Sequence, residues 1–168
     1  MPQNEVYDGP VLLGWIPKSA YAIVHEATRH LLKRPVVGIV AAARTKDGRW
    51  VLIRRADTGE WGLPGGTLEW GETLSEALVR ELEEEAGVTQ ISDVRVIGAW
   101  SKPSRDVRFH AVSIGVSCVV DPPAKPPKNP LEIREVRLFR DDELPERLAF
   151  EMQDIVAVAR RGEGTVLE

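Results

Sequence analysis

Three glutamates in one short segment have the spacing of a metal-binding cluster. Glu81 and Glu85 lie four residues apart and Glu84 lies three after Glu81, so on a helix they share one face, while Glu83 points away. Like charges at this spacing destabilise a helix by roughly 0.2–0.5 kcal/mol per pair, and a solvated acidic face is the usual explanation of such a run. Here Glu81 and Glu85 border an apolar stripe, which disfavours full solvation. Clustered carboxylates in that setting suit hard divalent cations such as Mg²⁺ or Mn²⁺.

The helix that carries these glutamates is delimited by its own sequence. Its apolar positions recur at helical spacing: Leu78, Leu82 and Ala86. Thr73 and Glu76 match a capping box and Gly87 is a typical stop, which predicts a helix over residues 74–86. The tight loop at residues 63–66 is rich in glycine, so its backbone carbonyls can approach a ligand closely. No cluster of cysteine and histidine accompanies the glutamates, which argues against zinc.

The segment from Gly66 to Val88 resembles the signature of the Nudix hydrolases. Gly66 is followed after five residues by Glu72, and after seven more by the run Arg80-Glu81-Leu82-Glu83-Glu84-Glu85-Ala86-Gly87-Val88. Seven required identities and two apolar positions fall at the family's spacing. The resemblance reaches from about Val36 to Val88, and more loosely to Ala159. It implies an α+β fold, a Nudix αβα sandwich with a mixed β-sheet, here preceded by an N-terminal strand-helix extension.

The resemblance also implies a role for each residue of this box. The implied metal ligands are three carboxylates and one backbone carbonyl: Glu81, Glu84, Glu85 and Gly66. Arg80 would orient the carboxylates and Glu72 would brace the loop or the metal shell, so both count as catalytic residues together with Glu84. A diphosphate carries several negative charges, which bound Mg²⁺ or Mn²⁺ would neutralise while lowering the pKa of a bound water.

A second segment bears on the substrate. Residues 103–113 resemble the Arg-Asp-Pro-Arg-x-His stretch of Nudix enzymes for ADP-ribose and nucleoside-diphosphate sugars, with Val107 in place of the usual proline. Arg105 or Arg108 could clamp a phosphate bidentately; the alternative is a hairpin tip with solvated arginines. His110 is assigned to the same site, although a structural role for it is favoured over a catalytic one.

Three further positions are assigned to the site. Arg54 and Arg55 end a strand where the family often places a basic residue on the phosphates; alternation lets only one of them face the site, and Arg55 is preferred. Trp61 could stack on a base. Related enzymes often take the glutamate that acts on the water from a loop after the long strand, and Glu132 is favoured there over Glu135.

These features predict a metal-dependent pyrophosphatase that splits ADP-ribose or a nucleoside-diphosphate sugar into a nucleoside monophosphate and a sugar phosphate. A (d)NTP-sanitising or RNA-cap pyrophosphohydrolase is an alternative, which the segment 105–110 disfavours. A non-catalytic Nudix-like ligand sensor is a second alternative, but such modules usually have an eroded box and this one is intact. The expected partner is therefore a small nucleoside-diphosphate compound.

The composition argues against several other classes of protein. The 168 residues include 22 basic and 26 acidic side chains, a net charge of -4, which argues against general nucleic-acid binding. The single cysteine, Cys118, suits a reducing compartment and is typical of a core residue rather than a nucleophile. No apolar run approaches the roughly 20 residues of a membrane helix, and the first residues lack the features of a signal peptide. A cytoplasmic location without membrane contact is therefore expected.

Three segments are expected along the chain. Residues 1–35 form an extension with a short strand and an amphipathic helix, residues 36–161 form the Nudix domain, and residues 162–168 form a frayed tail. The apolar side of the first helix needs a partner surface. We expect it to cross to a second chain in a homodimer, which would bring Trp15 or Tyr21 near the neighbouring site; packing on its own domain is the alternative.

The elements inside the domain follow from local patterns. Strands are predicted at residues 36–44, 50–55, 94–101, 109–120 and 133–139. The proline-rich residues 121–130 indicate a stiff loop rather than a linker between domains. A closing helix is predicted over residues 149–160, and the tryptophans Trp50 and Trp100 are expected in the core or an interface.

Overall fold

The computed structural model of the protein describes residues 23, 24, 28, 34–162 and 164–168. The chain divides into two units, Met1–Arg34 and Pro35–Glu168. The strand, helix and dimer contact predicted for residues 1–35 lie almost wholly outside the described residues, and they stay predictions. In the part of the chain that the structure describes, no helix is long and apolar enough to span a membrane.

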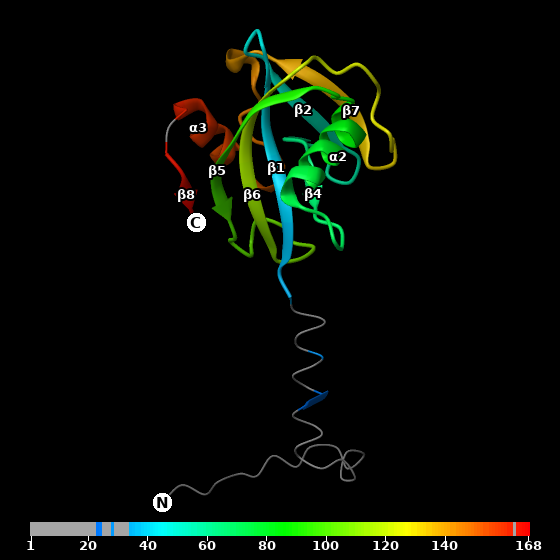
Figure 1. Cartoon of the computed structure of the whole chain (residues 1–168), viewed down its shortest axis with the longest axis vertical. Helices are drawn as coiled ribbons and strands as arrows, with labels where there is room; N and C mark the ends of the chain where they lie inside the picture. Colours follow the sequence, from blue (N-terminus) through cyan, green and yellow to red (C-terminus); the bar gives the residue numbers. More distant parts are fainter. Residues whose placement is uncertain (1–22, 25–27, 29–33, 163) are drawn as a thin grey trace, which may run out of the picture. The chain divides into compact units, whose positions relative to one another are not determined.

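A mixed sheet organises the described part of Pro35–Glu168 (Figure 1). Its strands are β1 (Val36–Thr45), β2 (Trp50–Arg55), β3 (Trp61–Gly62), β4 (Gly65–Thr67), β5 (Ile91–Trp100), β6 (Ala111–Val120), β7 (Ile133–Phe139) and β8 (Val166–Leu167). Their order is β3-β2-β1-β6-β5-β8, with β4 paired to β1 and β7 paired to β2. β1 is parallel to β6 and β5 is parallel to β8, whereas the other pairs are antiparallel. This confirms the mixed sheet.

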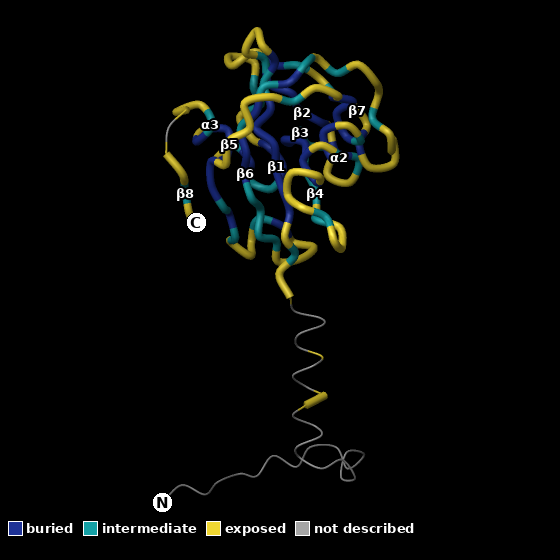
Figure 2. Tube along the Cα trace, viewed as in Figure 1, coloured by how far each residue is buried: buried dark blue, intermediate teal, exposed yellow. Residues whose placement is uncertain are grey.

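One helix covers each face of the sheet. α2 (Leu74–Ala86) packs on β1, β2, β4 and β7, whereas α3 (Gln153–Arg161) packs on β1, β5 and β6. Alternate residues of β1 enter two separate cores, with Ile39 and Ala41 on the α2 side and Val40 and Ala42 on the α3 side. Figure 2 shows these central strands as the buried part of the unit. The three layers confirm the predicted αβα sandwich.

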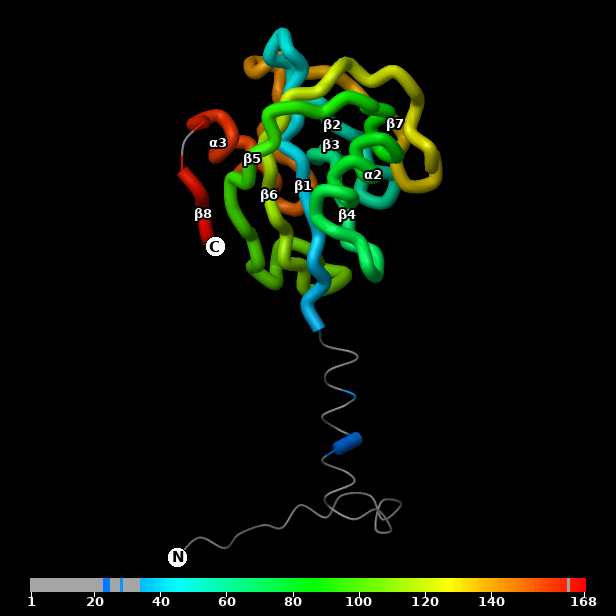
Figure 3. The backbone as a smooth tube through the Cα atoms, in the orientation of Figure 1, coloured from blue at the N-terminus to red at the C-terminus, as the bar shows by residue number. Residues whose placement is uncertain are grey.

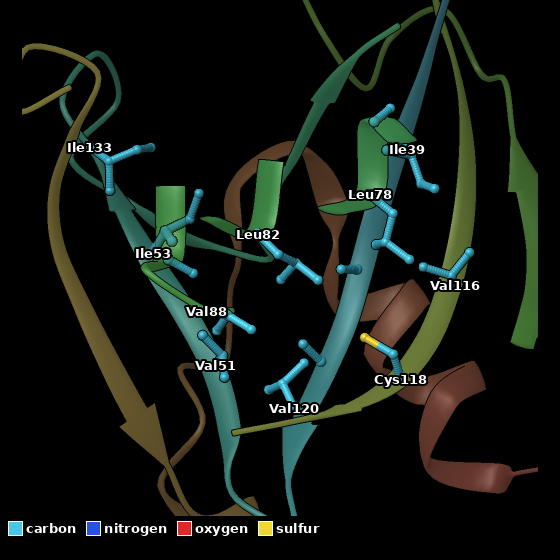
Figure 4. Close-up of a cluster of buried hydrophobic side chains, with 14 residues drawn as sticks. Ile39, Val51, Ile53, Leu78, Leu82, Val88, Val116, Cys118, Val120 and Ile133 are labelled. Carbon is cyan, nitrogen blue, oxygen red and sulfur yellow. The ribbon is translucent and has the colours of Figure 1, made fainter. Parts of the chain in front are cut away.

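The helix α2 begins and ends where the sequence predicts. The backbone N–H of Glu76 donates to the Thr73 hydroxyl at 3.3 Å, and the Glu76 carboxylate accepts from the N–H of Thr73 at 2.8 Å. The helix ends at Gly87, whose φ of 64° is left-handed and whose Cβ, if present, would collide with the carbonyl of Lys125. Figure 4 shows the apolar side of α2 packed against β1 and β2. The glutamate cluster therefore sits on a helix that is fixed at both ends.

The closing helix differs from its prediction. Instead of one helix over residues 149–160, the chain forms a short 3-10 turn, η3 (Ala149–Glu151), and then α3 from Gln153. Phe150 and Glu151 both have φ of 56°, in the left-handed region, so the helical path is broken within η3, before α3 begins. Neither residue type favours that region, which is why the local sequence does not reveal the break.

The end of the chain is also different from its prediction. Val166–Leu167 form β8 beside the last part of β5, as Figure 3 shows. The carboxylate of Glu168 accepts from the backbone N–H of Ser101 at 3.1 Å and from Arg105. The frayed tail predicted for residues 162–168 is therefore corrected. β5 would otherwise be an edge strand, and β8 covers that edge at Gly98 and Ala99.

The residues expected in the core lie there. Trp50 and Trp100 are 0% and 3% exposed, and the indole N–H of Trp50 donates to Asp141 at 2.9 Å. Cys118 packs in the core beside α2. Burial raises the pKa of the Cys118 thiol to about 12, so it remains protonated near neutral pH. The prediction of a core cysteine rather than a nucleophile is confirmed.

Candidate active site

A pocket of about 300 Å³ lies between α2 and the segment that precedes α3. Its wall includes backbone and side chains of β1 and β4, glutamates of α2, and the loop between β5 and β6. It gathers seven residues that the sequence singled out: Arg55, Gly66, Glu81, Glu85, Arg105, Arg108 and Glu132. The fold therefore brings the glutamate helix, the glycine loop and the arginine segment to one place.

Glu81 and Glu85 are the buried carboxylates that α2 contributes to this pocket, 9% and 6% exposed. The N–H of Gly65 donates to Glu85 at 2.8 Å, but burial outweighs this bond and raises the pKa of Glu85 to about 8. Burial also raises the pKa of Glu81, against the opposing effect of Arg80. A Cβ at position 66 would displace the Glu81 carboxylate, so glycine there leaves that carboxylate in its place beside Arg80. Two desolvated carboxylates of this kind gain most from a nearby cation.

Arg80 holds the carboxylates from one side of the helix. Its Nε and Nη2 donate to the two oxygens of Glu72 at 2.7 and 2.9 Å. Its Nη1 donates to Glu81 at 2.7 Å, and its Nη2 also donates to the carbonyl of Thr67 at 3.0 Å. These bonds from Arg80 lower the pKa of Glu72 to about 2. Arg80 and Glu72 thus join the loop after β4 to α2, in positions that suit the orienting and bracing roles.

Glu84 does not line the pocket. The Nζ of Lys128 donates to its carboxylate at 2.8 Å, and the backbone N–H of Lys128 donates to its carbonyl at 2.7 Å. Arg80 lies 3.8 Å from the other carboxylate oxygen of Glu84. Each clustered glutamate is therefore held by a different donor. Among the described residues, no three Asp, Glu, His or Cys side chains already converge as a metal site.

The structure distinguishes Arg55 from Arg54, and Glu132 from Glu135, as residues of the pocket. Arg55 is 8% exposed and lines the pocket, where Asp57 accepts two bonds from it at 2.9 Å each. Arg54 is exposed and faces Glu135 across the β2–β7 pairing, with their closest N and O atoms 3.9 Å apart. Glu132 precedes β7 and lines the pocket. The structure thus places Arg55 and Glu132 at the pocket, and Arg54 and Glu135 outside it.

Arg108 shares a partner with Arg55. Its Nε and Nη2 donate to the buried Asp106 at 2.9 and 2.7 Å, and its Nη1 donates to Asp57 at 3.1 Å. Asp57 thus bridges both arginines, and hydrogen bonds from Arg55 are the main reason that its pKa falls to about 2. The two guanidinium groups are held in fixed positions beside the pocket despite their like charge.

Arg105 reaches the pocket lining, but its donors are used within the protein. Its Nε and Nη2 donate to Glu168 at 3.0 and 2.7 Å, and its Nη2 also donates to Asp154 at 2.8 Å. Its Nη1 donates to the carbonyl of Glu151 at 2.8 Å. A bidentate phosphate clamp needs free parallel N–H groups. In this arrangement Arg105 instead anchors η3, α3 and β8 to the loop between β5 and β6.

Trp61 and His110 lie outside the pocket lining. The ring of Trp61 meets Phe139 edge-on, with centroids 4.9 Å apart and planes at 77°, because the pairing of β3 with β2 turns it toward the core under α3. The Nε2 of His110 donates to the carbonyl of Ser101 at 2.8 Å. The structure therefore does not bring these two predicted substrate residues to the other candidates.

Several residues in and around the pocket were not predicted from the sequence. Phe150, Met152 and Ile155 line the pocket from the side of α3, and Lys128 binds Glu84 from the proline-rich loop. Met152 and Ile155 have helical spacing, which core packing explains equally well. Their position depends on the break at Phe150, for which the sequence carries no glycine or proline signal.

Comparison with known proteins identifies the family. The profile of the NUDIX domain matches residues 32–159, more than half of the chain. The chain belongs to the Nudix family. This Nudix chain is 37% identical over 115 residues to the ADP-ribose pyrophosphatase of Methanocaldococcus jannaschii, covering 66% of the chain and 65% of that protein. It is 48% identical over 66 residues to the RNA pyrophosphohydrolase of Halorhodospira halophila, covering 39% of the chain and 35% of that protein. The chain thus spans less than two thirds of the length of either relative.

Solved structures agree with this assignment. The NUDIX domain of Shewanella oneidensis NrtR, crystallised with ADP ribose, superposes with a TM-score of 0.70 at 22% identity and covers 88% of this chain and 99% of its own. The MutT NUDIX hydrolase of Burkholderia pseudomallei gives 0.61 at 28% identity, covering 74% and 98%. The first likeness shows the fold alone. Both confirm that the sandwich described above is the Nudix fold.

Proposed function

We propose that this Nudix chain is a divalent-metal-dependent pyrophosphohydrolase whose substrate is ADP-ribose or a nucleoside-diphosphate sugar. The observation that carries the proposal is the buried pair Glu81 and Glu85 in a pocket that also holds Arg55 and Arg108. Carboxylates at one side and fixed arginines at another suit a diphosphate that binds together with cations. The similarity to the Methanocaldococcus jannaschii ADP-ribose pyrophosphatase supports the substrate class.

The donors around α2 fit a hard divalent cation. Glu81 and Glu85 are desolvated, which a bound cation would offset. Gly66, whose carbonyl is the further ligand proposed, adjoins the Glu81 carboxylate, and Glu84 lies on the same helix near Arg80. All of these are oxygen donors, the kind that Mg²⁺ and Mn²⁺ prefer. When bound by these residues, Mg²⁺ or Mn²⁺ would neutralise phosphate charge and lower the pKa of a coordinated water.

The protein residues would divide the remaining work. Hydrolysis forms a bond between a water oxygen and one phosphorus and breaks the bridging P–O bond, which releases a nucleoside monophosphate and a sugar phosphate. Glu132, which lines the pocket, would accept the proton of that water. Arg55 and Arg108 would hold phosphate oxygens, because Asp57 and Asp106 occupy only part of their N–H groups. Arg80 would keep Glu81 in place.

The substrate class can be tested with purified protein and Mg²⁺ or Mn²⁺. We expect kcat/KM for ADP-ribose or a nucleotide sugar to exceed that for every nucleoside triphosphate tested, because the fixed arginines flank a pocket suited to a bridged diphosphate. Mass spectrometry of the products should show AMP and ribose 5-phosphate from ADP-ribose. A preference for a triphosphate, with release of inorganic pyrophosphate, would reject the proposed substrate class.

A triphosphate or RNA-cap pyrophosphohydrolase is the second candidate. The observation in its favour is the similarity to the RNA pyrophosphohydrolase of Halorhodospira halophila. Including a 5′-triphosphorylated RNA in the substrate panel tests it directly. Tight ADP-ribose binding without turnover of any substrate would instead indicate a ligand sensor.

The contact of Lys128 with Glu84 predicts an effect on metal affinity. The ammonium group lies 2.8 Å from a carboxylate that we propose as a metal ligand, so it competes for the same charge. Exposed ion pairs are weak, so we expect Lys128→Gln to lower the Kd for Mn²⁺ only modestly, by roughly two- to fivefold. Titration calorimetry or electron paramagnetic resonance would measure this without turnover.

Lys125→Gln is the matched control for this experiment. Lys125 lies in the same loop and pairs at 3.4 Å with Glu83, the glutamate that points away from the cluster. Its removal changes net charge equally and should leave the Mn²⁺ affinity near that of the parent protein. Equal shifts in both variants would mean that overall charge, and not the contact with Glu84, sets the affinity.

A further inference from the structure

The backbone at Phe150 and Glu151 is unusual and is held from outside. Both residues have φ of 56°, a conformation that side-chain-bearing residues rarely adopt and that persists only when the surroundings enforce it. Arg105 supplies part of that support, because its Nη1 donates to the carbonyl of Glu151 at 2.8 Å and reaches that of Phe150 at 3.4 Å. Glu168 and Asp154 in turn fix Arg105. These contacts support the backbone that carries the Phe150 side chain.

The ring of Phe150 lies beside both arginines proposed for phosphate binding. The guanidinium carbon of Arg55 is 5.0 Å from the ring centroid, and that of Arg108 is 4.8 Å from it. Both distances are within the range of cation–π attraction. Together with the shared carboxylate of Asp57, the ring gives two like-charged side chains a common support.

Arg55 retains a free donor toward a ligand. Its Nε and Nη2 are bonded to Asp57, whereas its Nη1 has no hydrogen-bond acceptor in the described part of the protein. Arg55 also lines the pocket together with Glu81 and Glu85. A phosphate oxygen is the type of acceptor that this N–H would take. The direction of that donor depends on what fixes the guanidinium plane, namely Asp57 and Phe150.

We propose that Phe150 is a positioning residue, whose ring holds Arg55 and Arg108 for the phosphate groups of the ligand, and that Arg105 acts through Phe150 instead of contacting the ligand. The inference rests on the proposed function, because it takes a bridged diphosphate as the ligand. It assigns different roles to neighbouring arginines: Arg55 and Arg108 bind, and Arg105 supports.

The test compares Phe150→Leu, which removes the ring but keeps apolar bulk, with Phe150→Tyr, which keeps the ring. Two non-hydrolysable probes, α,β-methylene-ADP and methylenediphosphonate, carry the same bridged diphosphate with and without a nucleoside. With Mg²⁺ present, we expect Phe150→Leu to weaken both probes by a similar factor, about five- to tenfold, and Phe150→Tyr to stay near the parent protein. For ADP-ribose turnover, KM should rise in Phe150→Leu while kcat changes little.

The other outcomes are distinct. Loss of affinity for α,β-methylene-ADP alone would mean that Phe150 contacts the base. Unchanged affinity for both probes would mean that Phe150 does not hold Arg55 and Arg108 for the phosphate groups. Either result overturns the inference. If Phe150→Leu does not fold, Arg105→Lys gives a second comparison, since an ammonium group cannot replace the contacts with the two carbonyls, Asp154 and Glu168 together and should produce the same equal loss. A parent protein that binds neither probe and turns over no substrate would contradict the proposed function itself.

Discussion

We expect Glu85→Gln to lower kcat with Mg²⁺ by at least about 100-fold, since losing a ligand charge removes several kcal/mol of transition-state stabilisation. The same change should raise the melting temperature of the metal-free protein. Glu85 is 6% exposed and burial raises its pKa to about 8, so its ionised form opposes folding when no cation is bound. Glutamine can still accept the bond from Gly65.

The raised pKa of Glu85 also predicts how the stability of the metal-free protein changes with pH. A carboxyl whose pKa is raised by folding contributes most stability below its ordinary pKa, and that contribution is lost as the pH rises through about 8. Glutamine does not titrate. In EDTA, the melting temperature of Glu85→Gln should therefore exceed that of the parent protein by more at about pH 8.5 than at about pH 6.

Glu83→Gln is the matched control, because Glu83 lies on the same helix but its side chain is 53% exposed. It should change neither kcat nor the pH dependence of stability appreciably. Near-normal turnover of Glu85→Gln at saturating Mg²⁺ would show that the metal site has been placed wrongly.

The second large effect is expected from Arg80→Lys, which keeps the charge but loses the planar fork. One guanidinium now donates to Glu72, Glu81 and the carbonyl of Thr67, and an ammonium group cannot reproduce those directions. Loss of a residue that orients metal ligands typically costs about 10- to 100-fold in affinity or activity. We expect kcat/KM to fall by about that factor and Mn²⁺ binding to weaken in parallel.

Arg140→Lys provides the comparison for this variant. Arg140 is 65% exposed and pairs with Asp142 and Glu143 near the surface, so its replacement should leave both readouts unchanged. If Arg80→Lys retained full activity and full Mn²⁺ affinity, charge alone would suffice and the fork geometry would be irrelevant.

Local signals account for the parts of the fold that the sequence predicts well. The capping box at Thr73, the stop at Gly87 and the apolar stripe between them fix α2 residue by residue. Alternation along β1 and β2 is equally local, which is why the sequence alone lets only one of Arg54 and Arg55 face the site; the structure places Arg55 there. The strand at Ile133–Phe139 also begins and ends as predicted.

Contacts between distant residues account for the parts that the sequence does not predict. The partners of Arg105 are Glu151, Asp154 and Glu168, all more than 40 residues away, and they change an expected phosphate ligand into an anchor. The pairing of β8 with β5 has the same origin. A short segment of sequence does not reveal either contact, because both form only when the sheet is assembled.

The two cores on opposite faces of the sheet have an evolutionary consequence. The glutamates of α2 belong with one core, whereas Phe150, Met152 and Ile155 reach the pocket from the side of the other. Substitutions beneath α3 can therefore change the side of the pocket formed by Phe150, Met152 and Ile155, while the core packed under α2 stays the same. Because the two cores are separate, substrate preference can change during evolution while the residues of hydrolysis are kept.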